Sequence, residues 1–236
     1  GFVPGREWII SSSTDRTLKV WDMEQQDLLR EIQLDENIEE FVIINQELVV
    51  YPLSDGRIMA WDPGSDDEPE VLYADASRQP FQAIAYNPER KLLVTSSPGQ
   101  IKMIPFDPEI SGELITSTGT IEIGQKGVIS QLEFSPDNRW LVAAGTEAIL
   151  LWDLSDTENI SVQRYIPLVI ENDKMIFSLT FDRESKYLIY GDNQLLHIHP
   201  IDLGDIYNKL KLISGGEPLS QQAWDYYIKG NLERPD

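Results

Sequence analysis

The residues best suited to chemistry are two histidines, His197 and His199, which stand two positions apart in the segment LLHIHP. On a β-strand this spacing points both imidazoles to the same face. Together with a nearby carboxylate such as that of Asp192 they could bind zinc. The other interpretation is that both occupy ordinary strand positions, as Lys102 and Ile104 do in another part of the chain. We favour the second interpretation and predict no metal site.

The sequence lacks the groups that nucleophilic catalysis needs. It contains no cysteine, and neither histidine can be paired with a serine in a recognisable motif. Gly-x-Ser-x-Gly and the glycine loops that bind phosphate are also missing from it. We therefore predict no catalytic residue and no cofactor, and we expect that the chain is not an enzyme.

Acidic residues outnumber basic ones by 40 to 19, which gives a formal net charge of −21. Such a surface repels phosphate backbones and anionic lipid headgroups, so nucleic acids and membranes are poor candidates for partners. No apolar stretch approaches the ~20 residues needed to span a bilayer. The absence of cysteine fits either redox compartment. We expect a cytoplasmic protein whose partners are other proteins.

Two patterns repeat along the chain in register. In four places an aromatic residue is followed six positions later by another large apolar residue: Phe2 and Trp8, Tyr86 and Leu92, Phe134 and Trp140, Phe181 and Tyr187. Strand-like segments end in a second signal at Trp21-Asp22, Trp61-Asp62, Phe106-Asp107, Trp152-Asp153 and Ile201-Asp202. These aspartates lie 40, 45, 46 and 49 residues apart. Each unit reads as about four strands, which in the fourth unit are VISQLEF, RWLVAAG, AILLWDL and SVQRYIPLVI.

The repeated unit predicts an all-β fold. Its segments are rich in Val, Ile, Leu, Tyr and Phe and are bounded by Gly, Pro, Asp and Ser. A parallel sheet would need crossover helices, and helical periodicity is missing before about Gly204. An antiparallel unit of four strands repeated at this period is typical of a β-propeller blade. We predict about five blades over residues 2–203 and a short helical tail over residues 204–236.

The first unit, FVPGREWIISSSTDRTLKVWD, resembles the second half of a WD repeat, and the resemblance extends over residues 2–203. In that family an aspartate in a turn precedes the tryptophan by six residues, as Asp15 and Asp55 precede Trp21 and Trp61. The resemblance implies that this carboxylate accepts backbone N–H groups in a tight turn. The family's Gly-His pair is absent from every unit. The structural residues expected for the turns and blades are Asp15, Trp21, Asp55, Trp61, Trp152 and Asp192.

The resemblance also implies a larger context, because WD-repeat propellers usually have seven or eight blades. The five units would then be the C-terminal part of a larger ring. The tail segment LSQQAWDYYIKG is similar to the ends of some bacterial signalling proteins, in which a WD-repeat array follows a STAND NTPase or caspase-like module. Leu219, Ser220, Trp224 and Tyr227 match that pattern. This similarity implies a sensor that restrains or releases an effector.

Three basic residues occupy similar places in successive units. Arg78 and Lys126 each stand eight residues before the repeat aromatic, and Lys174 stands seven before it. If the loops that enter the first strands share one face, these cations could form a positive patch that meets an acidic segment or an anionic ligand. The other interpretation is that they are ordinary solvated loop residues.

The leading functional hypothesis is a non-catalytic scaffold or sensor module, because propellers present many loops on a rigid frame. The alternative is a propeller hydrolase or lyase with a site in the central channel. That alternative predicts polar groups on the first strands, which here read FVII, QAIAY, ISQLEF and FSLTF. A structural tether in a large assembly is a third reading that the sequence does not separate from the first. Open sheet edges also predict self-association.

Overall fold

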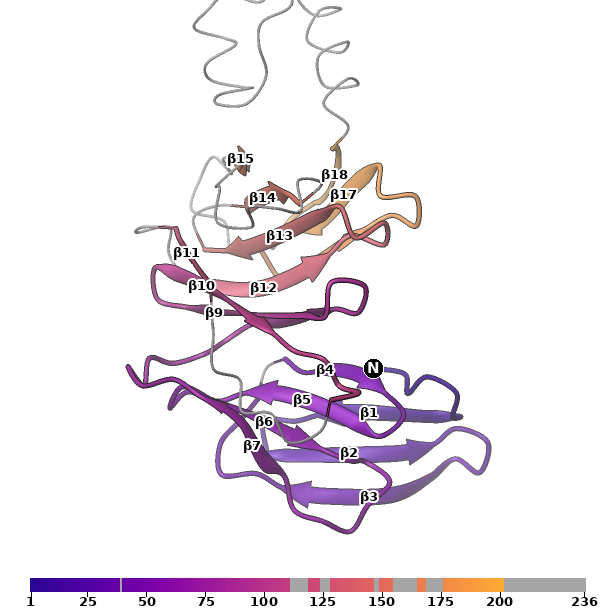
Figure 1. Ribbon diagram of the computed structural model, residues 1–236. Coiled ribbons are helices and arrows are strands. Elements are labelled where there is room, and N and C mark those ends of the chain that lie inside the picture. Colours follow the sequence, from indigo (N-terminus) through magenta and orange to yellow (C-terminus); the bar gives the residue numbers. More distant parts are fainter. Residues whose placement is uncertain are drawn as a thin grey trace, which may run out of the picture. The chain divides into compact units, whose positions relative to one another are not determined.

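Strands form where short apolar segments are bounded by turn residues. A computed structural model (Figure 1) describes residues 1–38, 40–110, 119–123, 128–146, 149–154, 165–168 and 176–201. Its strands are β1 (Trp8–Ser12), β2 (Thr17–Asp22), β3 (Asp27–Gln33), β4 (Val42–Asn45), β5 (Leu48–Pro52), β6 (Arg57–Trp61), β7 (Glu70–Ala74), β8 (Ile84–Asn87), β9 (Leu92–Ser97), β10 (Gln100–Pro105), β11 (Gly119–Glu122), β12 (Ile129–Phe134), β13 (Trp140–Gly145), β14 (Ile149–Asp153), β15 (Tyr165–Leu168), β16 (Ser178–Phe181), β17 (Tyr187–Gly191) and β18 (Leu196–Pro200).

The all-β prediction is confirmed for the described residues, which contain strands and turns but no helix. In this part of the chain no helix has the length and apolar character needed to cross a membrane. The helical tail predicted for residues 204–236 lies outside the described residues. It therefore stays a prediction.

Every sheet is an antiparallel meander of strands that follow one another in the sequence. Three sheets have four strands, β4–β7, β8–β11 and β12–β15, as the repeat predicts. The first and the last, β1–β3 and β16–β18, have three described strands each. Phe2 adds an isolated bridge to Ile9 at the other edge of β1. The four segments expected in the fourth unit coincide with β12, β13, β14 and β15.

The described chain divides into two compact units, Gly1–Leu132 and Glu133–Asp236, and β12 spans their boundary. In the first unit the sheets β1–β3 and β4–β7 pack face to face through a shared apolar core (Figure 1). Ile10, Leu18 and Val20 of the first sheet meet Val49 and Trp61 of the second. Burial of these side chains is the main source of stability for such a sheet pair.

Alternation of side chains along a strand explains why the inner strands are apolar at every position. Val49 of β5 faces the first sheet, whereas Val50 lies in the next cluster with Ile84 and Leu93 of the third sheet. Both valines are fully buried. In the second unit the same arrangement joins the fourth and fifth sheets through a core of Trp140, Val142, Ala144, Ile149, Leu151, Ile176, Phe181, Leu188, Tyr190 and Ile201.

An ion pair ties the second sheet of the first unit to the third. The Nζ atom of Lys102 on β10 lies 2.7 Å from Oδ2 of Asp75, which directly follows β7. Their side chains are only 11% and 9% exposed. Burial favours a higher pKa for Asp75, but hydrogen bonds from Lys102 and Ser77 outweigh it and the pKa is lowered. The carboxylate is therefore held in its charged form by Lys102.

A carboxyl group of β12 joins the two sheets of the second unit. Oε1 of Glu133 accepts hydrogen bonds from the Thr180 hydroxyl, at 3.0 Å, and from the backbone N–H of Phe181, at 3.3 Å. Burial raises the pKa of Glu133, and the two hydrogen bonds oppose this shift without cancelling it. The protonated form is therefore favoured more than in an exposed glutamate.

Candidate functional site

The turn aspartates of the first two sheets accept hydrogen bonds from the residue two positions ahead. Oδ1 of Asp15 lies 3.1 Å from the backbone nitrogen of Thr17 and 2.6 Å from its hydroxyl oxygen. The hydroxyl hydrogen bond is the main reason why the pKa of Asp15 lies below its ordinary value. Oδ1 of Asp55 accepts the Arg57 N–H at 3.1 Å, and Oδ2 accepts its Nε–H at 2.7 Å. Both carboxylates hold a tight turn between two strands.

In the fifth sheet, four residues separate the paired Gly191 and Leu196, one fewer than separate the paired Ser12 and Leu18 of the first sheet. The carboxylate of Asp192 contacts residues farther along the chain than that of Asp55 does. Oδ1 of Asp192 accepts the backbone N–H groups of Gln194 and Leu195, both at 2.7 Å. Oδ2 lies 2.9 Å from Nε2 of His197. The side chain of Asp192 is 1% exposed, so the turn and His197 of β18 enclose it.

The two histidines lie side by side, but each contacts a protein side chain. The rings of His197 and His199 stack on Tyr190 with centroid distances of 4.7 and 5.4 Å. Nε2 of His199 lies 3.1 Å from the Tyr190 hydroxyl oxygen. Within the residues that the structure describes, no group of three or more acidic, histidine or cysteine side chains could hold a metal ion. Stacking on Tyr190 makes both rings part of the packing between β17 and β18.

The three tryptophans occupy one register position in three sheets, yet their environments differ. Trp21 pairs with Ile9 across the sheet, and its Nε1 donates to the Ser11 hydroxyl at 2.9 Å. Trp61 and Trp152 pair with Val49 and Leu141. The Nε1 atoms of both are buried and have no hydrogen-bond partner among the described residues.

Strand register explains this difference. Ser11 stands two residues after the residue that pairs with Trp21. The same position holds Tyr51 in the second sheet and Ala143 in the fourth, and neither places a hydroxyl beside the indole. In the fifth sheet it holds Tyr190, which meets His199 in the tryptophan position. The prediction that Ile201 matches the tryptophans is therefore wrong, because Ile201 lies two residues beyond that position. The same two strand positions therefore hold a different pair of side chains in each of the four sheets.

The basic residues expected to form a patch are only partly described. Arg78 lies in an exposed loop after β7 with a φ of 52°, a left-handed conformation that non-glycine residues adopt rarely. Lys126 and Lys174 lie outside the described residues. The described residues therefore do not test the patch, which stays a prediction.

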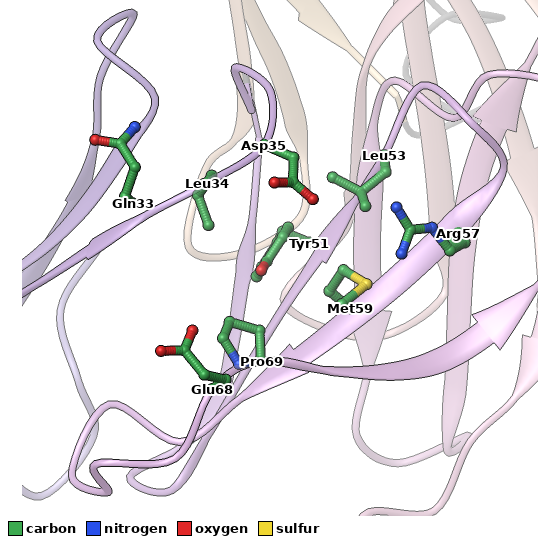
Figure 2. Close-up of a pocket in the computed structure, with 9 residues that line it drawn as sticks. All are labelled: Gln33, Leu34, Asp35, Tyr51, Leu53, Arg57, Met59, Glu68 and Pro69. Atoms are coloured by element: carbon green, nitrogen blue, oxygen red, sulfur yellow. The ribbon is translucent and has the colours of Figure 1, made fainter.

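A pocket of about 160 Å³ lies within the first unit, between the end of β3 and the strands β5 and β6 (Figure 2). Its apolar wall consists of Leu34, Leu53, Met59 and Pro69, and its polar groups belong to Gln33, Asp35, Tyr51, Arg57 and Glu68. In Figure 2 the Tyr51 side chain lies between the carboxylates of Asp35 and Glu68, and Arg57 lies near Leu53 and Met59. The pocket thus combines polar and charged side chains with an apolar wall.

Residues 1–22 and 115–153 match the family model described as WD domain, G-beta repeat. These two segments are similar to WD repeats. A search of curated proteins gave no match to the chain.

The two matched segments contain the features that define the repeat here. Residues 1–22 hold the Asp15 turn and Trp21, and residues 115–153 end with Trp152 and Asp153. WD repeats are typically non-catalytic and generally form scaffolds for protein interaction. Similarity to a bacterial STAND NTPase or caspase-like context has no support from the comparison.

Sequence reasoning missed the pocket residues Asp35, Tyr51 and Glu68. Asp35 and Glu68 lie in two different connections and Tyr51 lies on β5, so no local spacing links them. The signal that could have found one of them was Tyr51, a tyrosine at the register position where the first repeat has Ser11.

Proposed function

We propose that this chain is a protein-interaction scaffold that acts by surface complementarity. The observation that supports this function is the repeated meander, which sets loops at regular intervals on packed sheets and matches WD repeats in two segments. Loops on a rigid frame suit recognition, because the frame bears the cost of ordering them. We place this function in the cytoplasm.

The finer part of the proposal concerns context. We infer that the units form part of a larger propeller and serve as the sensor segment of a signalling protein. The sensor role is suggested by the tail, whose matching residues are Leu219, Ser220, Trp224 and Tyr227. Support for the larger ring comes from Trp21, which is 39% exposed, whereas Trp61 at the same register is 2% exposed. A preceding sheet would cover Trp21 as the first sheet covers Trp61.

Charge reversal in the basic loops tests whether these loops recognise a protein partner. The triple variant Arg78→Glu, Lys126→Glu, Lys174→Glu reverses the predicted patch. Affinity purification from cells that contain the full-length gene product, followed by mass spectrometry, measures which proteins are retained. We expect an acidic protein partner to be lost from the variant, because like charges across an interface cost several kcal/mol.

A matched control reverses three other basic residues, Arg16, Arg183 and Lys186, and leaves the proposed patch intact. We expect the control to retain the partner. Equal loss from both triple variants would contradict the patch, because it would point to the overall charge alone. Recovery of no specific protein with the unaltered chain would contradict the scaffold function itself.

A further inference from the structure

Neighbouring sheets of the repeat meet through two unlike faces. In the first unit, Leu18 and Val20 of the first sheet pack against Trp61 of the second. All three side chains are at most 2% exposed. We call the side of a sheet with the tryptophan position its indole face, and the opposite side, which holds Leu18 and Val20 in the first sheet, its aliphatic face. The interface thus joins the aliphatic face of one sheet to the indole face of the next.

The second unit combines the same two faces. Leu151 of the fourth sheet directly precedes Trp152 on β14 and therefore lies on the aliphatic face. It packs with Leu188 and Tyr190 of the fifth sheet. Leu188 pairs with His199, which holds the tryptophan position, so the fifth sheet turns its indole face to the fourth. In both units an aliphatic face therefore covers an indole face.

The aliphatic face of the fifth sheet is exposed. Leu196 pairs with the last residue of β17, as Leu18 pairs with the last residue of β1. Ile198 and Val20 each stand two positions later on the same face. Leu18 and Val20 are 0% exposed, whereas Leu196 and Ile198 are 69% and 59% exposed. The apolar positions that are covered in the first sheet are thus open in the fifth.

The indole face of the first sheet is exposed as well. Trp21 is 39% exposed, whereas Trp61 is 2% exposed at the same register. Leu28 pairs with Trp21, shares its face and is 45% exposed. The Nζ atom of Lys19 on this face lies 3.5 Å from Oε2 of Glu31, so its charge is paired. The first and fifth sheets thus expose the two unlike halves of one type of interface.

We propose that the aliphatic face of the fifth sheet packs on the indole face of the first sheet in a second copy of this chain. The contact continues the interface between the first two sheets, with Leu196 and Ile198 in the places of Leu18 and Val20. Each copy has both halves, so the contact is heterologous and links copies head to tail. The inference rests on the larger ring proposed above, and it names a second copy as the source of the sheet that covers Trp21.

Charge does not oppose this contact, although the chain has a formal net charge of −21. The positions of β17 and β18 on the aliphatic face hold no charged side chain: Tyr187, Ile189, Gly191, Leu196, Ile198 and Pro200. Like charges that face each other across an interface weaken it. Two copies can therefore meet here without such repulsion from the strands of the fifth sheet.

Two variants with opposite defects test the contact in the full chain. Leu196→Glu with Ile198→Glu charges the aliphatic face of the fifth sheet, and Leu28→Glu charges the indole face of the first. Sedimentation velocity over a concentration series measures association. We expect the unaltered chain to associate and each variant alone to associate at least about tenfold more weakly. An equimolar mixture of the two variants should form a one-to-one dimer, because it keeps one intact pair of faces.

Three results would overturn the proposal: an unaltered chain that stays monomeric, a mixture that forms no dimer, or a Leu28→Glu chain that associates as the unaltered chain does. The last result would mean that fifth-sheet faces pair with each other. Trp21→Gln is a second variant of the indole face and should weaken association as Leu28→Glu does. Val71→Glu, at an exposed position of β7, should leave association unchanged, and thermal unfolding verifies that each variant is folded. A monomeric chain that still retains a protein partner in the affinity purification overturns the second copy and leaves the scaffold function intact.

Discussion

At the residue scale, the buried indole nitrogens of Trp61 and Trp152 have no hydrogen-bond partner among the described residues. In the first sheet the Ser11 hydroxyl receives the corresponding N–H from Trp21. The fourth sheet has Ala143 at that register, and its small side chain leaves Trp152 without an acceptor. A missing acceptor at such a site costs free energy that a hydroxyl can restore.

The variant Ala143→Ser supplies that hydroxyl. We expect it to be more stable than Ala144→Ser by about 2 kcal/mol in free energy of unfolding, because Ala144 packs in the apolar core with the fifth sheet. Both alanines are fully buried, so the two variants form a matched pair. Urea denaturation measures the difference. Equal loss of stability in both variants would show that Trp152 already has an acceptor.

The raised pKa of Glu133 predicts that the stability of the fold depends on pH. Its folded-state pKa is raised by burial, so between the ordinary carboxyl range and that raised value the folded state keeps a proton that the unfolded state has lost. The stability that this group contributes is therefore present in acid and is lost as the pH rises through its folded pKa.

The variant Glu133→Gln keeps an acceptor oxygen for Thr180 and Phe181 but does not ionise. We expect the free energy of unfolding of the variant, taken relative to that of the unaltered chain, to increase as the pH rises from about 4 to about 7. Chemical denaturation at both pH values gives the difference. Glu89→Gln, which removes an exposed carboxylate, controls for net charge, and an equal gain in that control would refute the explanation.

At the element scale, the ion pair between Lys102 and Asp75 connects two sheets where most contacts are apolar. Lys19 provides a natural comparison, because it occupies the same register in the first sheet. Its contacts with Glu31 and Asp15 are longer, at 3.5 and 3.8 Å, and its side chain is 25% exposed. Burial thus separates two lysines that occupy the same position in the strand register.

We expect Lys102→Met to lower the free energy of unfolding by about 3 kcal/mol, because it leaves the buried carboxylate of Asp75 without its cation. Lys19→Met should cost less than about 1 kcal/mol, as is usual for exposed ion pairs. Thermal or urea unfolding of both variants measures this. Similar losses would mean that Asp75 is solvated after the substitution.

Much of the element level could be predicted from the sequence. The apolar segments and the Trp-Asp spacing located the strands of the fourth sheet, because strand side chains alternate and the turn residues delimit them.

Other features depend on contacts between distant segments. The pocket is lined by Asp35 and Glu68 from two connections and by Tyr51 from β5, and Asp75 meets Lys102 from the next sheet. Loops of variable length carry these acids, so spacing does not place them. The strand register decides which side chain lies beside each indole, and the spacing of residues in the sequence does not give that register.

At the scale of the whole molecule, the outer face of the fifth sheet is apolar and exposed. Tyr187, Leu196 and Ile198 are 41%, 69% and 59% exposed on that face, whereas Leu188 and Tyr190 on the other face are buried in the core. Exposed apolar faces of this kind mark contacts with another surface. This motivates the expectation of self-association.

We expect the isolated chain to associate at increasing concentration, and Leu196→Glu with Ile198→Glu to weaken that association about tenfold or more. Sedimentation velocity over a concentration series measures both. The control Val71→Glu with Ile110→Glu places the same charges at exposed apolar residues elsewhere. A chain that stays monomeric throughout would contradict the expectation.

Each hydrogen-bonded ladder joins strands that leave the ribosome one after the other. A sheet such as β12–β15 occupies residues 129–168, so at about 5–20 residues per second its last strand emerges only seconds after its first. Such local pairing needs little loop closure and favours early formation of each sheet. A nascent chain can thus complete one sheet while the next is still being made, and it adds buried surface in steps as synthesis proceeds.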